Sequence, residues 1–122
     1  MNQYSPVILA PKLKPKDLQW AVGFLEGEGC FSHNKSSQSV SVYQSGSTET
    51  LLRLQRYFGG TIAKKRASGT AKFIKSKLQK YEWRVYGARA RHAMKQVYPH
   101  MSIRRKSKIL EVLQGDEDWA KA

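Results

Sequence analysis

The most informative stretch of this sequence is AVGFLEGEG, at residues 21–29. It has the apolar side chains of a packed helix, yet Gly23 and Gly27 each destabilise a helix by about 1 kcal/mol relative to alanine. Glycines four residues apart lie on one helix face, where a second helix backbone can approach closely. Glu26 and Glu28 fall at the C-terminal end, where the helix dipole disfavours anions unless cations or a metal are near. A kinked core helix with an exposed end would explain each feature but not their combination.

The chain around this stretch has the length and composition of one globular domain. It has 122 residues, of which 40% are hydrophobic and 25% charged. The longest apolar run, residues 20–25, is far shorter than the about 20 residues of a membrane span, and the first residues lack signal-peptide features. The lone Cys30, which we expect to be a small packed residue, excludes an internal disulfide and a cysteine-based zinc cluster. We therefore expect one domain over residues 1–122 of an intracellular protein that is not secreted.

Positive charge is concentrated in one part of the sequence. The formal net charge is +13, to which residues 64–108 contribute +14, from fifteen basic side chains and one acidic. Such density repels itself in a compact fold unless a polyanion offsets it. A solvated surface would mix both signs, and no long basic amphipathic helix favours a membrane surface; a ribosome-like binder is a further alternative. Nucleic acid is therefore the expected partner.

Glycine, proline and capping residues divide the sequence into elements. An extended basic arm over residues 1–16 precedes a helix that Asp17 caps and that Gly27 and Gly29 end. The further elements are strands at 30–35 and 38–44, a helix at about 47–58, strands at 61–66 and 81–86, a helix at 88–98, a helix that Ser102 caps, and an acidic tail at 115–122. This order predicts an α+β fold with an antiparallel or mixed sheet and its helices on one face.

Alternation along the strands indicates which side chains face away from the helices. Tyr81, Trp83 and Val85 form an apolar face of the last strand. The opposite face of the sheet is expected to bind DNA through Ser32, Asn34, Gln38, Ser39, Ser41, Tyr43, Lys64, Arg66, Glu82 and Arg84. This mixture suits the major groove of duplex DNA, because cations bind phosphates and guanines while amides and hydroxyls bind base edges. Few aromatic rings are available to stack on single strands, and an ordinary solvated face would carry more acidic residues.

Residues 21–29, followed by Cys30 and Phe31, resemble the nine-residue signature of the LAGLIDADG homing endonucleases. The order of elements over about residues 16–113 is also similar to that family. The resemblance implies an αββαββα fold whose saddle-shaped sheet lies over the major groove of double-stranded DNA. Members with one motif are homodimers that pack their motif helices together. It therefore implies a homodimer joined at Gly23 and Gly27 on a pseudo-palindromic site.

The same resemblance implies an active site at the subunit interface. Glu28 matches the family's metal-binding carboxylate, one from each subunit, which together hold Mg²⁺ or another divalent cation at the scissile phosphates. Glu26 is expected to have a structural role instead. Gln44 stands where the family often has a glutamine near the attacking water. Arg104, with Lys106 as the second candidate, replaces a catalytic lysine; an arginine can stabilise phosphate charge but does not transfer protons.

Other chemistries find little support in the sequence. The three histidines lie on different predicted elements without metal-binding spacing. No serine stands in a nucleophile elbow, and no glycine loop has P-loop spacing. The sequence therefore predicts a site-specific, Mg²⁺-dependent DNA endonuclease. The alternatives are a non-catalytic DNA-binding repressor on the same fold and an RNA-binding intron splicing factor.

Overall fold

The structure, a computed structural model, describes residues 9, 11–34, 37–65 and 78–114. Its elements are α1 (Pro15–Glu28), β1 (Cys30–His33), β2 (Gln38–Ser45), α2 (Glu49–Phe58), β3 (Thr61–Lys65), β4 (Lys80–Tyr86), α3 (Gly87–Val97), the 3-10 helix η2 (Tyr98–His100) and α4 (Ile103–Val112). This order confirms the predicted α+β class. Within the described ranges, no helix is both long and apolar enough to cross a membrane.

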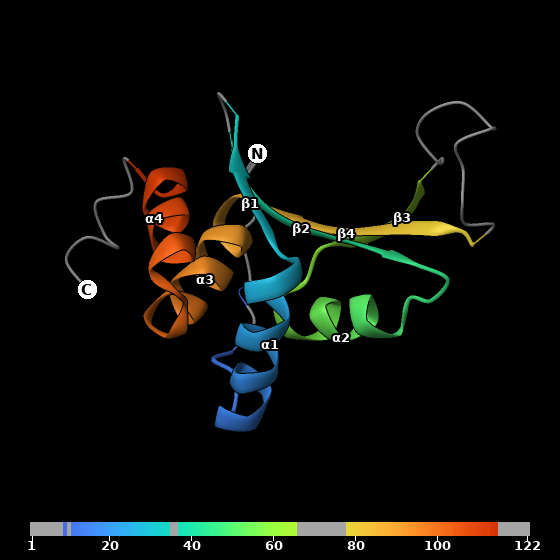
Figure 1. Cartoon of the computed structure of the whole chain (residues 1–122), viewed down its shortest axis with the longest axis horizontal. Helices are drawn as coiled ribbons and strands as arrows, with labels where there is room; N and C mark the ends of the chain where they lie inside the picture. Colours follow the sequence, from blue (N-terminus) through green and yellow to red (C-terminus); the bar gives the residue numbers. More distant parts are fainter. Residues whose placement is uncertain (1–8, 10, 35–36, 66–77, 115–122) are drawn as a thin grey trace, which may run out of the picture.

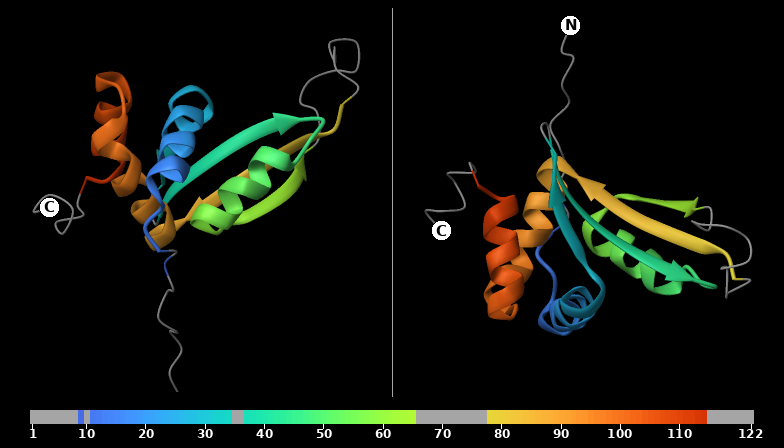
Figure 2. Two further views of the ribbon diagram at one scale, coloured as in Figure 1. Left: turned by 90° about the horizontal axis from the view of Figure 1, so that it is seen from below. Right: turned by 45° about the horizontal axis from the view of Figure 1, so that its top comes forward.

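The four strands form one antiparallel sheet in the order β1-β2-β4-β3. Strands β2 and β4 are long and curved, and α1, α2 and α3 lie on one side of them (Figure 1). Helix α4 stands beside α3, near β1, as the second view in Figure 2 also shows. One face of the sheet is thus covered by helices, here called the helix face, and the other, the open face, is not.

The core lies between the helix face and the helices. Val40 and Val42 of β2 and Trp83 and Val85 of β4 are buried there, which confirms the alternation predicted for both strands. The indole N–H of Trp83 donates to the carbonyl of Gly59 at 2.8 Å, so the largest core side chain has its polar atom satisfied. The helices contribute buried apolar side chains, which include Ala21, Leu25, Leu51, Leu54, Phe58, Ala90, Met94, Val97, Ile109 and Val112.

Helix α1 begins three residues earlier than predicted, at Pro15, and its cap is Lys14 in place of Asp17. Proline fits the first turn of a helix because its missing N–H would have no intrahelical acceptor there. Asp17 therefore lies inside the first turn, where its carboxylate accepts a hydrogen bond from Tyr57 at 2.9 Å. The arm ends at Lys14; its residues 1–8 and 10 lie outside the described residues, as does the predicted acidic tail at 115–122.

Candidate active site and nucleic-acid interface

The motif stretch forms the second half of α1 and has two opposite faces. Ala21 and Leu25 are buried against the core. Gly23 and Gly27 are exposed, and a Cβ placed on either would meet no described atom within 4 Å. Helix α1 therefore presents a strip without side chains, the surface that two helix backbones need for close approach. At Gly29, by contrast, a Cβ would come within 2.7 Å of the Leu25 carbonyl oxygen, so only glycine fits there.

Glu26 joins the C-terminal end of α1 to the N-terminal end of α4. Its two carboxylate oxygens accept hydrogen bonds from the backbone N–H and the hydroxyl of Ser102, both at 2.8 Å. Arg105 donates to the Glu26 carbonyl at 2.9 Å. The backbone hydrogen bond from Ser102, then its hydroxyl and the charges of Arg105 and Arg104, lower the pKa of Glu26. The expected structural role of Glu26 is confirmed.

Glu28 and Arg104 lie on either side of this junction. Glu28 is the exposed last residue of α1, and it makes no hydrogen bond or ion pair with any described residue. Arg104, exposed in the first turn of α4, lines a cleft of about 440 Å³ with Gly29 and Cys30. The packing expected for Cys30 is wrong, because its thiol is exposed at this cleft. The end of α1 thus carries an unpaired carboxylate, and the first turn of α4 carries an unpaired guanidinium.

At the junction of α1 and α4, one unpaired carboxylate, that of Glu28, could bind a divalent cation. The Glu28 carboxylate suits a hard cation, but the described part of the chain contains no group of three or more His, Cys, Asp or Glu side chains that could hold a metal. The remaining oxygen ligands must come from water, from phosphate or from another copy of the chain. The described residues therefore supply one ligand of a cation site and not a complete set.

The other two predicted catalytic residues, Lys106 and Gln44, have no side-chain hydrogen bond or ion pair with Glu28 or Arg104. The ammonium of Lys106 lies 5.6 Å from the centre of the Tyr98 ring, and residues two apart on a helix point in nearly opposite directions. Gln44 pairs with Tyr81 near the end of β2 and makes no hydrogen bond to Glu28 or Arg104. Their catalytic roles stay predictions.

Two side chains predicted on the open face lie on the helix face. Lys64 pairs with Tyr81, and its neighbour Lys65 lies on the open face instead. Ile62 sets this phase, because it packs against the core opposite Trp83 and every second residue of β3 follows it. The assignment of Gln38 is wrong for a related reason: it shares the face of Val40, and its amide oxygen accepts a hydrogen bond from Arg91 of α3 at 2.9 Å. The predicted Arg66 lies outside the described residues.

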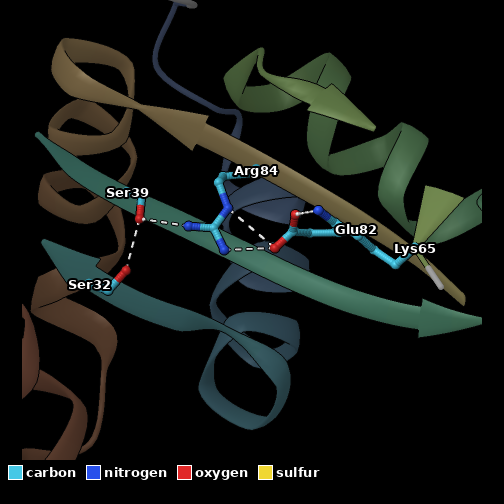
Figure 3. Close-up of polar contacts among 5 residues, drawn as sticks. All are labelled: Ser32, Ser39, Lys65, Glu82 and Arg84. Carbon is cyan, nitrogen blue, oxygen red and sulfur yellow. Dashed lines mark hydrogen bonds and ion pairs between the residues drawn. The ribbon is translucent and has the colours of Figure 1, made fainter. Parts of the chain in front are cut away.

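The open face carries a chain of polar contacts that crosses all four strands (Figure 3). Ser32 of β1 hydrogen-bonds to Ser39 of β2 at 2.8 Å, and Arg84 of β4 donates to Ser39 at 3.4 Å. Arg84 also donates to one oxygen of Glu82, from Nη2 at 2.7 Å and from Nε at 3.2 Å. Lys65 of β3 completes the chain with an ion pair to Glu82 at 3.2 Å.

Glu82 is the centre of this network, and it is buried and ionised. Burial alone would raise its pKa, but hydrogen bonds from Arg84, Tyr43 and Lys65 outweigh burial and lower the pKa to about 2. The same contacts raise the pKa of Arg84, through hydrogen bonding to Glu82, and raise that of Tyr43. The open face thus holds its central charges in fixed places at neutral pH.

The predicted serines lie on the open face but are covered. Ser39 is 5% exposed and Ser41 1% exposed, and the Ser41 hydroxyl has no hydrogen-bond partner among the described residues. Of the other predicted contacts, Tyr43 is 42% exposed, and the Asn34 side chain accepts a hydrogen bond from the backbone of Ser37 in the β1–β2 turn. The two serines therefore lie beneath this surface, whereas Tyr43 and Asn34 are part of its outer layer.

Two residues of the site were missed from the sequence. Lys65 was not among the residues predicted on the open face, although the apolar Ile62 three residues earlier indicates that it lies there. Arg105, whose side chain is 12% exposed, ties α4 to α1, and its guanidinium lies 5.5 Å from the Phe31 ring. No local pattern distinguishes Arg105 from Arg104, since the distinction depends on the packing of two helices far apart in sequence.

No family model matches the sequence, and no curated protein sequence matches it. Solved structures do match. The complex of the homing endonuclease I-CvuI with its target DNA, in the presence of Ca, has a TM-score of 0.56 and 22% identity, covering 81% of this chain and 67% of that one. The complex of I-CvuI with the I-CreI target and Mg, in which the DNA is not cleaved, has a TM-score of 0.55 and 22% identity, with coverages of 80% and 64%.

The homing endonuclease I-TnaI has a TM-score of 0.45 and 20% identity, covering 91% of this chain and 96% of that one. The chain spans about two thirds of the length of I-CvuI. The likeness to I-CvuI agrees with the motif helix, the element order and the curved antiparallel sheet. The chain therefore has the fold of the LAGLIDADG homing endonucleases.

Proposed function

We propose that the protein is a homodimeric endonuclease that cuts double-stranded DNA at a specific, pseudo-palindromic site with a divalent cation, Mg²⁺ in the first place. The observation that carries this proposal is the junction of α1 and α4. There Glu28, the residue directly after Gly27 of the open strip, and Arg104, in the first turn of α4, are both exposed and unpaired. An unpaired carboxylate at a helix C-terminus is unfavourable alone, and a bound cation would remove that penalty.

The homodimer follows from the position of Glu28. Gly27 directly precedes it, so two α1 helices packed along their glycine strips would bring two Glu28 carboxylates together. Mg²⁺ is commonly held by one or two carboxylates together with phosphate oxygens and water. When bound, it would polarise the phosphate and lower the pKa of a bound water. One chain offers half of this arrangement, and a second copy would supply the rest.

Arg104 is proposed to stabilise the negative charge that develops on the phosphate. Its position depends on Glu26, which holds the first turn of α4 through Ser102. A fixed cation aimed at developing charge needs no reorganisation during the reaction. Because an arginine does not transfer protons at neutral pH, this role is electrostatic. Gln44 and Lys106 stay candidates for orienting water and for binding phosphate.

The open face of the sheet is proposed to bind the major groove. Lys65, Lys80 and Arg84 lie on this face, and the chain carries a net charge of +13. I-CvuI, which shares the fold, was crystallised with DNA targets. Phosphate contacts by such cations would supply salt-dependent affinity, while Arg84 and its neighbours would supply sequence preference.

The test is a selection on a pool of random DNA duplexes. Cut and bound molecules are sequenced after incubation in Mg²⁺ and in EDTA. We expect double-strand cuts in Mg²⁺ at one group of pseudo-palindromic sequences, and binding without cutting to the same sequences in EDTA. Cutting that is indifferent to metal, or binding that is indifferent to sequence, would contradict the proposal.

A second candidate is a DNA-binding protein that does not cut, such as a repressor. The observation that favours it is Arg104 at the position where the resemblance expects a lysine, because an arginine cannot transfer protons as a lysine can. The same selection separates the two functions. Selected binding with no cutting under any divalent cation would identify the repressor.

A further inference from the structure

Glu82 is an unusual residue for a surface proposed to face DNA. It is the one acidic side chain among residues 64–108. Its carboxylate is ionised and lies on the open face, where it repels phosphate groups. Its side chain is 6% exposed, so burial adds a desolvation penalty that its hydrogen bonds must offset. A residue with these two disadvantages needs a role that a neutral side chain would not fulfil.

The contacts of Arg84 indicate what that role is. A guanidinium has five N–H donors. Glu82 accepts from Nε and from Nη2 of Arg84, and Ser39 accepts from Nη1. Beyond these three bonds, one N–H is left on each of the two terminal nitrogens. The exposed hydroxyl of Tyr43 also hydrogen-bonds to this guanidinium, so an approaching base would take the place of that contact. The Arg84 side chain is 27% exposed, so part of the guanidinium lies outside the carboxylate that holds it.

Two N–H groups on adjacent nitrogens match one base better than the others. Guanine presents the acceptors O6 and N7 side by side in the major groove, and an arginine binds both at once. Adenine places a donor beside N7, and pyrimidines offer no such pair of acceptors. A guanidinium that is already held in one orientation loses less conformational entropy on binding.

The rest of the network holds this arrangement from both sides. Ser39, which accepts from Arg84, is itself hydrogen-bonded to Ser32 on the outer strand. Lys65, on the opposite side, pairs with the second oxygen of Glu82 and leaves the first oxygen to Arg84. Figure 3 shows these side chains lying along one line across the sheet.

We infer that Glu82 is a positioning residue that holds Arg84 as a fixed pair of donors for one guanine in each half of the DNA site. The inference rests on the proposed function, since it requires the open face to meet the major groove. In this role Glu82 lowers the affinity for DNA of any sequence but strengthens the preference for guanine. Without the carboxylate, DNA of any sequence binds more tightly, but the preference for guanine weakens.

The test compares binding preferences in EDTA, where no strand is cut. Glu82→Gln keeps the size of the side chain and removes its charge. We expect the preference for guanine at one pair of symmetry-related positions to fall roughly tenfold, while affinity for random duplexes rises several-fold. The matched control is Glu49→Gln on α2, an exposed carboxylate whose removal changes the net charge equally. It should leave the guanine preference unchanged.

Arg84→Lys provides a second variant that leaves the buried carboxylate paired with Lys65. It keeps the charge but loses the pair of donors, so it should lose the same guanine preference, and the double variant with Glu82→Gln should lose no more than either. A full guanine preference in either single variant would overturn the inference alone. Wild-type protein that binds duplexes without any preference would overturn the proposed function as well.

Discussion

Two glutamate–arginine pairs of this molecule have opposite environments. Glu82 and Arg84 are joined by two hydrogen bonds and lie within a network across the sheet. Glu28 and Arg104 lie on either side of a helix junction, both exposed and neither bonded to a described residue. Charges that satisfy each other are held in place and can orient a contact. Charges without protein partners are available for a metal ion or a phosphate. Glu82 and Arg84 are therefore suited to recognising DNA, and Glu28 and Arg104 to catalysing its cleavage.

The largest effect should follow from changing Glu28. Glu28→Gln removes a proposed metal ligand without changing the fold, so cleavage of the selected site should fall by roughly 1,000-fold or more. DNA affinity should stay similar or increase slightly, since a negative charge near phosphate is lost. Single-turnover cleavage and binding titrations measure the two effects. The exposed Glu49→Gln on α2 is the control, and an unchanged rate in Glu28→Gln would place the active site elsewhere.

The next effect concerns the strip that would bring two Glu28 residues together. Gly23→Leu fills a space in which no described atom lies within 4 Å of a Cβ, so one chain should fold normally. Two copies could not approach as closely, and the protein should become monomeric and lose its affinity for the pseudo-palindromic site. Light scattering measures the mass, with Gln114→Leu as a control for an added surface leucine. A Gly23→Leu dimer would mean that subunits meet at another surface.

Arg104 should contribute to the chemical step rather than to binding. Arg104→Ala removes a fixed cation near the proposed reacting phosphate, and the single-turnover rate should fall roughly 100-fold. Arg104→Lys keeps the charge and should keep much of the activity. Parallel binding titrations at several salt concentrations supply the comparison. If Arg104→Ala weakens binding alone, its guanidinium contacts a phosphate without helping cleavage.

Much of this fold was predictable because local signals agreed with one another. The alternation of Val40 and Val42, the helix cap at Ser102 and the glycines that end α1 and α2 each indicate an element correctly. The role of Glu26 was predictable too, because a carboxylate at a helix C-terminus requires a partner.

Most of the errors arose where the decisive contact was distant or where a local signal was missing. The run of basic residues that starts at Lys64 contains no apolar side chain, so only Ile62 earlier in the strand sets which face each residue takes. For Gln38 the local signal was present, because it stands two residues before Val40 and so shares its face, where Arg91 donates a hydrogen bond to it. The covering of Ser41 depends on three strands at once, and no window of sequence contains them.

The paired glutamate should also make stability depend on pH. The pKa of Glu82 is lowered from 4.5 to about 2 in the folded state. Its stabilising contribution is therefore complete above about pH 5 and is lost as the pH falls towards 2, and it amounts to at most about 3 kcal/mol. Urea unfolding should show Glu82→Gln less stable than wild type at pH 7, with the difference shrinking below pH 4. A difference that stays constant with pH would mean that Glu82 is not ionised in this network.

The smallest effect should come from Ser102→Ala. This change affects Arg104 through the first turn of α4 and leaves Arg84 on the sheet unaffected. Ser102→Ala removes the hydroxyl that caps α4 and that donates to Glu26, which should destabilise the protein by roughly 1 kcal/mol. The backbone N–H of Ser102 still donates to Glu26, so α4 stays in place but its first turn is held less firmly. Arg104 lies in that turn, whereas Arg84 is on the sheet. Cleavage should therefore slow several-fold while the sequence preference of binding stays unchanged, and a changed preference would show that the α1–α4 junction also takes part in reading the DNA.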